Sequence, residues 1–302
     1  MYEELTVACE RKDKLNMAYI KFVVIVGVAV LLASTGLGQA DETAIAGNKI
    51  MNSCKDAIVK VEVVVQNKWM MNGKEIQNRE SKSEITGTVL DPSGLVLVSF
   101  TAIDPSKFME GLISGMGNEM KMKMDMKLTL KDVKVILPDE TELDAKVVLR
   151  DKDLDMAFIR PTQKTAKPMA SVKMSDQSHP RIMDEIVILS RLDKVASHAP
   201  SVMSTRISAV VIKPRTFYVP QLAGGGMEYI GTPAFTLDGK LVGVVLMRVL
   251  TNEGGTGFSA MMGGTGAMGI TAVIMPVSEI LEASKQAVDE PKEETKEPKV
   301  KE

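Results

Sequence analysis

The sequence predicts an all-β fold, either a sandwich or a barrel. From about Asp56 onward, short runs rich in β-branched residues dominate the chain, for example AIVKVEVVV and ITAVIMP. Turn signals such as Asp91-Pro92-Ser93-Gly94 and the Asp-Gly pair at 238–239 separate these runs. Few segments have helical spacing. Many short strands with turn residues between them are typical of all-β domains.

The composition is that of a globular protein with a substantial core. The chain has 302 residues, of which 45% are hydrophobic and 25% charged, so one large or two modest domains are expected. The formal net charge of −2 gives no overall field that would attract nucleic acid or an acidic membrane surface. We therefore expect no nucleic-acid partner.

Residues 1–40 have the pattern of an export signal. The basic residues Arg11, Lys12, Lys14 and Lys21 precede the apolar run FVVIVGVAVLLA, and a small-residue stretch ends at Ala40. The apolar run is short for a membrane span, which needs about 20 residues. We expect a signal peptide, with a retained N-terminal anchor as the alternative. Either one places the rest of the chain outside the cytoplasm, in the periplasm or the extracellular space, and limits membrane contact to an uncleaved signal.

Two helices and a tail flank the predicted strands. Residues 41–55 form a helical lead-in, and Cys54 near its end is expected to be a small buried side chain. The segment 277–288 has helical spacing, with Ile280 and Leu281 on one face and Ser278 as the predicted N-cap. Residues 288–302 are charged and contain prolines, so we expect a solvated tail.

The segment 105–132 has the character of an insertion. Its core MKMKMDMKL alternates, and an extended strand would carry its methionines on one face. Thioethers suit Cu(I), so a copper-binding protein is one alternative function. We favour an ordinary strand or a partner-binding hairpin, because no His or Cys lies beside these methionines, and we expect no cofactor. The weak metal candidates are Met120, Met122, Met124 and Met126.

The order of motifs resembles the trypsin-like serine proteases of the HtrA/Deg type. ITGTVLDPSGLVLVSFTAID is similar to the segment that leads to their catalytic His, and VKVILPDETELDAKVVLRDKDLDMAFIRP to the segment with the triad Asp. GTPAFTLDGKLVGVVL resembles the hairpin after the nucleophile, and ITAVIMPVSEILEASKQA the last strand and closing helix. The resemblance covers residues 50–287 in order.

This resemblance implies a chymotrypsin/trypsin-like double six-stranded β-barrel with a short C-terminal helix, at residues 56–287. The first barrel is expected at about 56–165, with the methionine-rich insertion at 105–132, and the second at about 180–276. The family usually appends a PDZ domain, and we expect its mode of peptide binding to be absent here, because residues 288–302 are a charged tail.

The resemblance also locates the positions of the catalytic triad. It places the His position at Thr101, the Asp at Asp155 and the nucleophile at Ile230, so that one of the three residues is retained. The turn that would hold an oxyanion reads Ile230-Gly231-Thr232. Without the other two members, Asp155 is expected to accept backbone hydrogen bonds at a strand entrance.

The chain's two histidines offer weak replacements for the lost base. His179 is expected to be solvated in the linker between the barrels. His198 lies in a loop of the second barrel that could be near the position of the family's substrate cleft. We therefore expect a pseudoprotease that binds a protein or an extended peptide, as a scaffold or regulator. The binding site would be the cleft between the barrels, which is expected to be lined by Ile230 and Thr101 and hence to be more apolar. An active serine endopeptidase of the same family is the second alternative. The oligomeric state is not indicated.

Overall fold

The computed structural model describes residues 41–71, 73–106, 124–165, 167–223, 226–249 and 270–287. Contacts divide the chain into two compact units, Met1–Ala44 and Ile45–Glu302, and every described strand belongs to the second. The expected signal at 1–40 and the tail at 288–302 lie outside the described residues. In the described ranges, no helix has both the length and the apolar character required to cross a bilayer.

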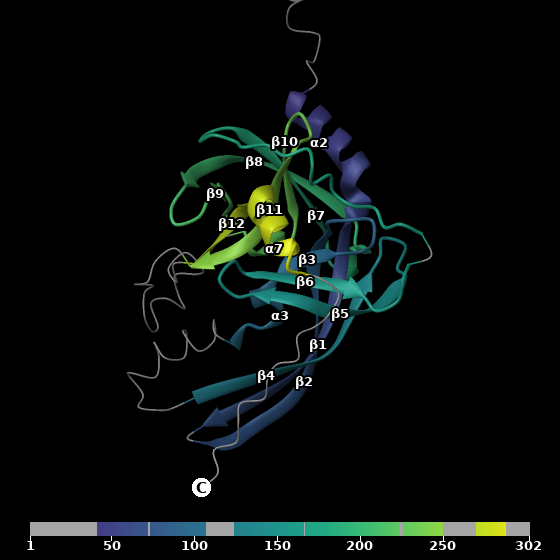
Figure 1. Cartoon of the computed structure of the whole chain (residues 1–302), viewed down its shortest axis with the longest axis vertical. Coiled ribbons are helices and arrows are strands. Elements are labelled where there is room, and N and C mark those ends of the chain that lie inside the picture. Colours follow the sequence, from purple (N-terminus) through teal and green to yellow (C-terminus); the bar gives the residue numbers. More distant parts are fainter. Residues whose placement is uncertain are drawn as a thin grey trace, which may run out of the picture. The chain divides into compact units, whose positions relative to one another are not determined.

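Twelve strands of the described residues form two closed antiparallel barrels, shown in Figure 1. This arrangement confirms the predicted double six-stranded barrel of trypsin-like architecture. The first barrel has the order β1-β2-β3-β6-β5-β4 and the second β10-β11-β12-β9-β8-β7. The strands are β1 (Ile58–Met71), β2 (Lys74–Val89), β3 (Val96–Ser99), β4 (Met124–Ile136), β5 (Glu142–Asp151), β6 (Met156–Pro161), β7 (Glu185–Arg191), β8 (Pro200–Val211), β9 (Phe217–Pro220), β10 (Pro233–Thr236), β11 (Leu241–Val249) and β12 (Ile270–Pro276).

The helices are short and flank the strands. The closing helix α7 has Ile280 buried as predicted, but its N-cap is Pro276, without a side-chain cap. The prediction of Ser278 as the cap is wrong, because the helix begins one residue before it, at Val277. Cys54 is half-buried, and this burial raises the pKa of its thiol. The helices are α2 (Glu42–Cys54), η1 (Lys55–Ala57), α3 (Phe100–Ile103), η2 (Lys194–Ala196), η4 (Met227–Tyr229) and α7 (Val277–Ser284).

Two of the predicted turns form with glycine in the left-handed region. The Gly94 amide donates to the Asp91 carbonyl at 3.0 Å, and the Gly239 amide donates to the Thr236 carbonyl at 2.8 Å. Both glycines have a φ near +90°, which side chains rarely adopt. These turns join β2 to β3 and β10 to β11, and thus fix the register of each pair.

The apolar core consists of three clusters. One fills the first barrel, with Val61 and Val98 among its members, and one fills the second, with Ile188 and Ile274. The third and largest takes side chains from both barrels and from α7. The barrels are therefore joined by a core of their own as well as by the chain between them.

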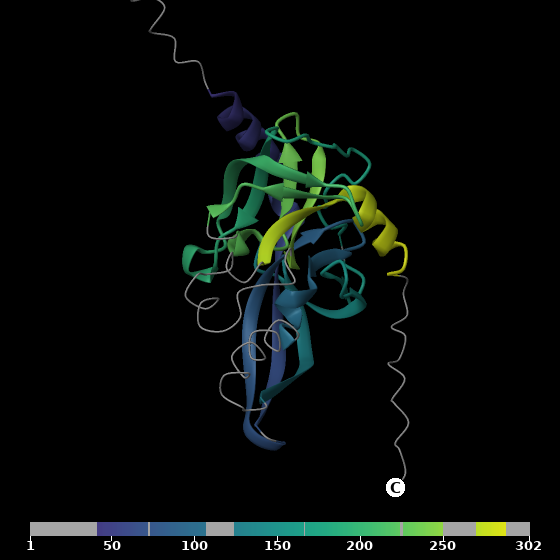
Figure 2. The same ribbon diagram turned by 90° about the vertical axis from the view of Figure 1, so that its left-hand side faces the viewer.

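Three long strands extend the first barrel. β1, β2 and β4 continue past the barrel as a three-stranded ribbon, visible in Figure 1 and in the turned view of Figure 2. Pairing continues to the end, with a register shift after Trp69 in the β1–β2 pair and after Val64 in the β1–β4 pair. Met71 pairs with Lys74 on one side and with Met124 on the other. Residues 124–132 of the expected insertion thus belong to β4.

Candidate functional site

Asp155, at the position that the resemblance assigns to the triad Asp, joins the two barrels. It lies at the entrance of β6 with a φ of 56°, and it is buried. Its Oδ2 accepts hydrogen bonds from the Ser99 hydroxyl at 2.6 Å and from the Met247 amide at 2.8 Å. Its Oδ1 accepts from the Thr101 amide at 2.8 Å. Since Ser99 and Thr101 belong to the first barrel and Met247 to β11, one carboxylate connects both.

The surroundings of Asp155 suit a structural carboxylate. Burial raises its pKa, and the hydrogen bonds from Ser99, Thr101 and Met247 oppose that rise. Thr101, at the expected His position, lies in α3 directly against it. A threonine hydroxyl cannot remove a proton near neutral pH, so this pair lacks the base that a triad requires.

The turn at residues 230–232 has no free amide for an oxyanion. The Ile230 amide donates to the Met227 carbonyl at 3.3 Å, and the Thr232 amide donates to the Tyr229 carbonyl at 3.1 Å. The Gly231 amide donates to the Val245 carbonyl at 2.7 Å. An oxyanion hole needs N–H groups that point at the substrate oxygen. In this turn all three amides are bonded to the protein itself.

The same turn is pressed against the first barrel. The Thr88 hydroxyl donates to the Gly231 carbonyl at 2.8 Å. A Cβ atom on Gly231 would lie 1.9 Å from the Thr86 carbonyl oxygen, and Gly231 has a φ of +85°. Only glycine fits here without a shift of backbone. The Ile230 side chain is turned inward and packs in the core of the second barrel.

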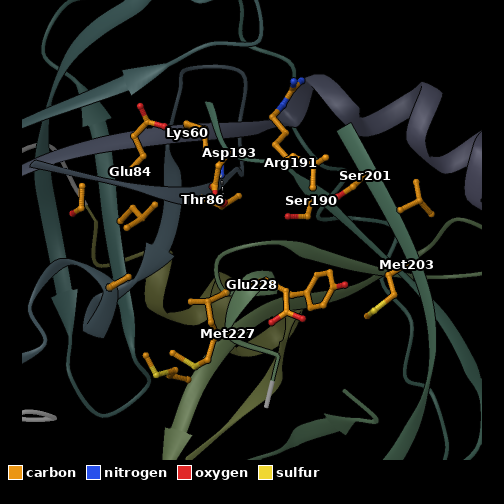
Figure 3. A pocket seen from close by; sticks show the side chains of 18 residues that line it. Lys60, Glu84, Thr86, Ser190, Arg191, Asp193, Ser201, Met203, Met227 and Glu228 are labelled. Carbon is orange, nitrogen blue, oxygen red and sulfur yellow. Dashed lines mark hydrogen bonds and ion pairs between the residues drawn. The ribbon is translucent and has the colours of Figure 1, made fainter. Parts of the chain in front are cut away.

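A cavity of about 530 Å³ lies between the barrels beside this turn (Figure 3). Ile230 lines it, as does Ala102, the neighbour of Thr101, whereas Thr101 and Asp155 do not. The cavity lies between the barrels, where the resemblance places the substrate cleft, but Thr101, which was expected in its wall, does not line it, and the wall includes charged side chains. The lining residues are Lys60, Ser83, Glu84, Ile85, Thr86, Ala102, Ser190, Arg191, Leu192, Asp193, Ser201, Val202, Met203, Met227, Glu228, Tyr229, Ile230 and Met247.

Two cations of the cavity wall are buried. The Lys60 Nζ lies 3.2 Å from the Thr86 hydroxyl oxygen and 3.3 Å from Oδ1 of Asp193. The guanidinium of Arg191 points away from the cavity (Figure 3) and donates to the carbonyls of Ile58, Lys55 and His198. Burial lowers the Arg191 pKa, and the nearby Asp56 opposes this. Neither residue was predicted from the sequence as part of a site.

The two histidines have different surroundings. His198 is buried in the second barrel, with its Nδ1 3.0 Å from Glu140 and its Nε2 3.1 Å from Glu84, both of which belong to the first barrel. It therefore links the barrels, with Glu84 also on the cavity wall. His179 is exposed, and its Nδ1 lies 3.2 Å from the Tyr218 hydroxyl.

Most of the methionine side chains proposed as metal ligands lie outside the part of the chain that the structure describes. Met120 and Met122 fall outside the described residues, and of Met124 only the backbone, the start of β4, is described. Met126 is buried in β4 opposite Trp69. No group of three or more His, Cys, Asp or Glu that could hold a metal occurs in the described part of the chain.

No protein-family profile matches the sequence, and no curated protein matches it either. The trypsin-like architecture therefore stands on the two barrels and their strand order.

Proposed function

We propose that this chain is an exported, non-catalytic protein of HtrA-type ancestry that binds a protein segment or extended peptide between its barrels. It would act as a scaffold or a regulator. The turn at residues 230–232 carries this proposal, because it combines a buried Ile230 with three amides bonded to carbonyls. A site without nucleophile, base or free oxyanion donors has none of the parts that acyl transfer requires.

The retained Asp155 fits a binding protein as well as a protease. Its oxygens hold the Thr101 and Met247 amides in place, which stabilises the barrel interface beside the cavity. Selection for the fold alone would therefore keep this residue after the loss of the other two.

The cavity supports the choice of an extended partner. Strand β2 pairs with β3 only at Thr88 and Val89, so in the described residues no strand covers its outer edge at Ser83, Glu84 and Ile85. These three residues line the cavity. A peptide could bond to this edge as an added strand while its side chains enter the cavity.

A fluorophosphonate probe, which reacts with activated serines, tests the loss of catalysis. We expect no labelling of the purified protein and no release of fragments from unfolded casein, with an active trypsin-like protease as the positive control. The double variant Thr101→His with Ile230→Ser should also stay unlabelled, since its turn amides remain bonded to carbonyls. Covalent labelling of the unmodified protein at any residue would contradict the proposal.

A further inference from the structure

Lys60 is the most unusual charge in the inter-barrel cavity. Its side chain is only 5% exposed, although it alternates with Val59 and Val61, which fill the first barrel, and therefore points out of that barrel. Burying an ammonium group is costly unless acceptors surround it. Figure 3 shows Lys60, Thr86 and Asp193 together on one side of the cavity, with Met227 and Glu228 on the other.

The acceptors around Lys60 leave its ammonium group able to bind a further anion. An ammonium group has three N–H donors. Within the described residues, two acceptors lie within reach of Nζ, the Thr86 hydroxyl at 3.2 Å and Asp193 at 3.3 Å. The Asp193 side chain is 90% exposed, so water competes for it. A buried cation thus has a weak, solvent-facing counterion.

The Asp193 side chain can move away from Lys60 without disturbing the loop to which it belongs. The Asp193 backbone carbonyl accepts from the Ala196 amide at 2.8 Å, which closes the short helix η2. Among the described residues, the Asp193 carboxylate forms a hydrogen bond and ion pair with Lys60 and with no other side chain. The Asp193 carboxylate therefore occupies the position in which the carboxylate of a ligand would bind. When this side chain moves, the backbone hydrogen bond keeps the loop in the same conformation.

The other charged groups of the wall are bonded to other residues or lie across the cavity from Lys60. Arg191 donates to three backbone carbonyls, and Glu84 is held by His198. Glu228 lies on the opposite wall (Figure 3). Around it the lining is apolar, with Met203, Met227, Met247 and Ile230. Methionine-lined walls adapt to apolar side chains of different shape.

We propose that the inter-barrel cavity binds a peptide carboxylate adjacent to an apolar side chain, with Lys60 as its cationic partner and Asp193 as the group that it displaces. This inference rests on the proposed peptide-binding function and specifies its ligand. The carboxylate comes either from the peptide C-terminus or from an Asp or Glu side chain, because both present the same chemistry to Lys60.

The test uses three randomised peptide pools of about ten residues on the immobilised protein. One pool has a free C-terminus without Asp or Glu, one has Asp and Glu with an amidated C-terminus, and one has no carboxylate. We expect at least one carboxylate pool to be retained about tenfold more than the third, the factor that one charge-assisted hydrogen bond supplies. The favoured pool identifies the source of the carboxylate.

Variants assign the effect to the cavity. Lys60→Met should abolish the preference, and Asp193→Ala should strengthen it severalfold. Lys68→Met, which removes an equivalent charge from the same strand outside the cavity, should leave it unchanged. Because Asp193→Ala predicts a gain, the test does not depend on the folding of Lys60→Met. Equal retention of all pools in every variant would overturn this inference while leaving peptide binding intact. Failure to retain any pool would overturn the binding function itself.

Discussion

At the scale of single residues, Asp155 is the position where a catalytic and a structural role can be separated. We expect Asp155→Asn to lower the free energy of unfolding by about 1–3 kcal/mol at neutral pH, because the amide nitrogen would face a backbone N–H in place of an acceptor oxygen. The donors at stake are the Thr101 and Met247 amides and the Ser99 hydroxyl. Urea unfolding of both proteins measures the difference.

The pH dependence of this difference has a definite sign. Burial raises the Asp155 pKa in the folded state, so folding favours the protonated carboxyl. The resulting stability is fully present below the unfolded pKa and is lost as pH rises through the folded pKa. The advantage of the unmodified protein over Asp155→Asn should thus be largest in acid and should narrow towards neutral pH. An advantage that widens with pH would mean that the folded pKa is lowered instead.

At the scale of elements, the contact between the 230–232 turn and β2 depends on glycine at position 231, which has no side chain. Gly231→Ala would place Cβ 1.9 Å from the Thr86 carbonyl oxygen, at a φ of +85°. Gly239→Ala is a matched control, because Gly239 has a φ of +88° but its nearest neighbour would be 3.9 Å away. We expect the control to cost about 1–2 kcal/mol of unfolding free energy from the backbone conformation alone.

Gly231→Ala should cost about 2 kcal/mol more than the control, because β2 or the turn has to move. Thermal unfolding of the two variants gives the comparison directly. If both variants lose the same stability, then the turn is not held against β2. A larger loss in Gly231→Ala than in Gly239→Ala would establish this contact as part of the barrel interface.

Strand runs could be predicted from the sequence, whereas the charges of the cavity could not. The alternation of IVKVEVVV places Val59, Val61 and Val63 inside the first barrel, as period-two patterning requires. The same rule places Lys60 outside, where solvent is the ordinary expectation. Lys60 is buried because the second barrel covers that face, and Asp193 lies 133 positions away in the chain. No local pattern carries such a contact.

The resemblance predicted triad positions, but it did not predict the state of the turn. Spacing from Pro233 identifies Ile230, and the amide bonds of residues 230–232 depend on carbonyls contributed by η4 and β11. The ribbon formed by β1, β2 and β4 was also not predicted beyond the barrel. Residues 74–83 of β2 are polar apart from Ile76 and mostly exposed, so they lack the apolar alternation that indicates a strand.

At the scale of the whole molecule, the two barrels share enough structure to unfold together. The third apolar cluster takes Ile58 and Phe158 from the first barrel and Phe235 and Val244 from the second. Cross-barrel hydrogen bonds add to it, including Thr88 to Gly231 at 2.8 Å and Arg191 to Ile58 at 2.7 Å. If one barrel opened alone, the side chains of the other barrel in this cluster would be exposed to water. Neither barrel is therefore expected to be stable by itself.

We therefore expect a single unfolding transition in urea. Fluorescence of Trp69, the chain's one tryptophan, follows the ribbon of the first barrel, and hydrogen exchange of peptides from β2, β6, β7 and β11 follows both barrels. The urea midpoints of unfolding measured for these peptides should coincide. Gly231→Ala should lower all of these midpoints equally, although its Cβ contact is with one strand. An earlier transition confined to β7 and β11 would mean that the second barrel opens independently. In that case the cavity would be lost before the first barrel unfolds, and peptide binding would decline ahead of the loss of Trp69 signal.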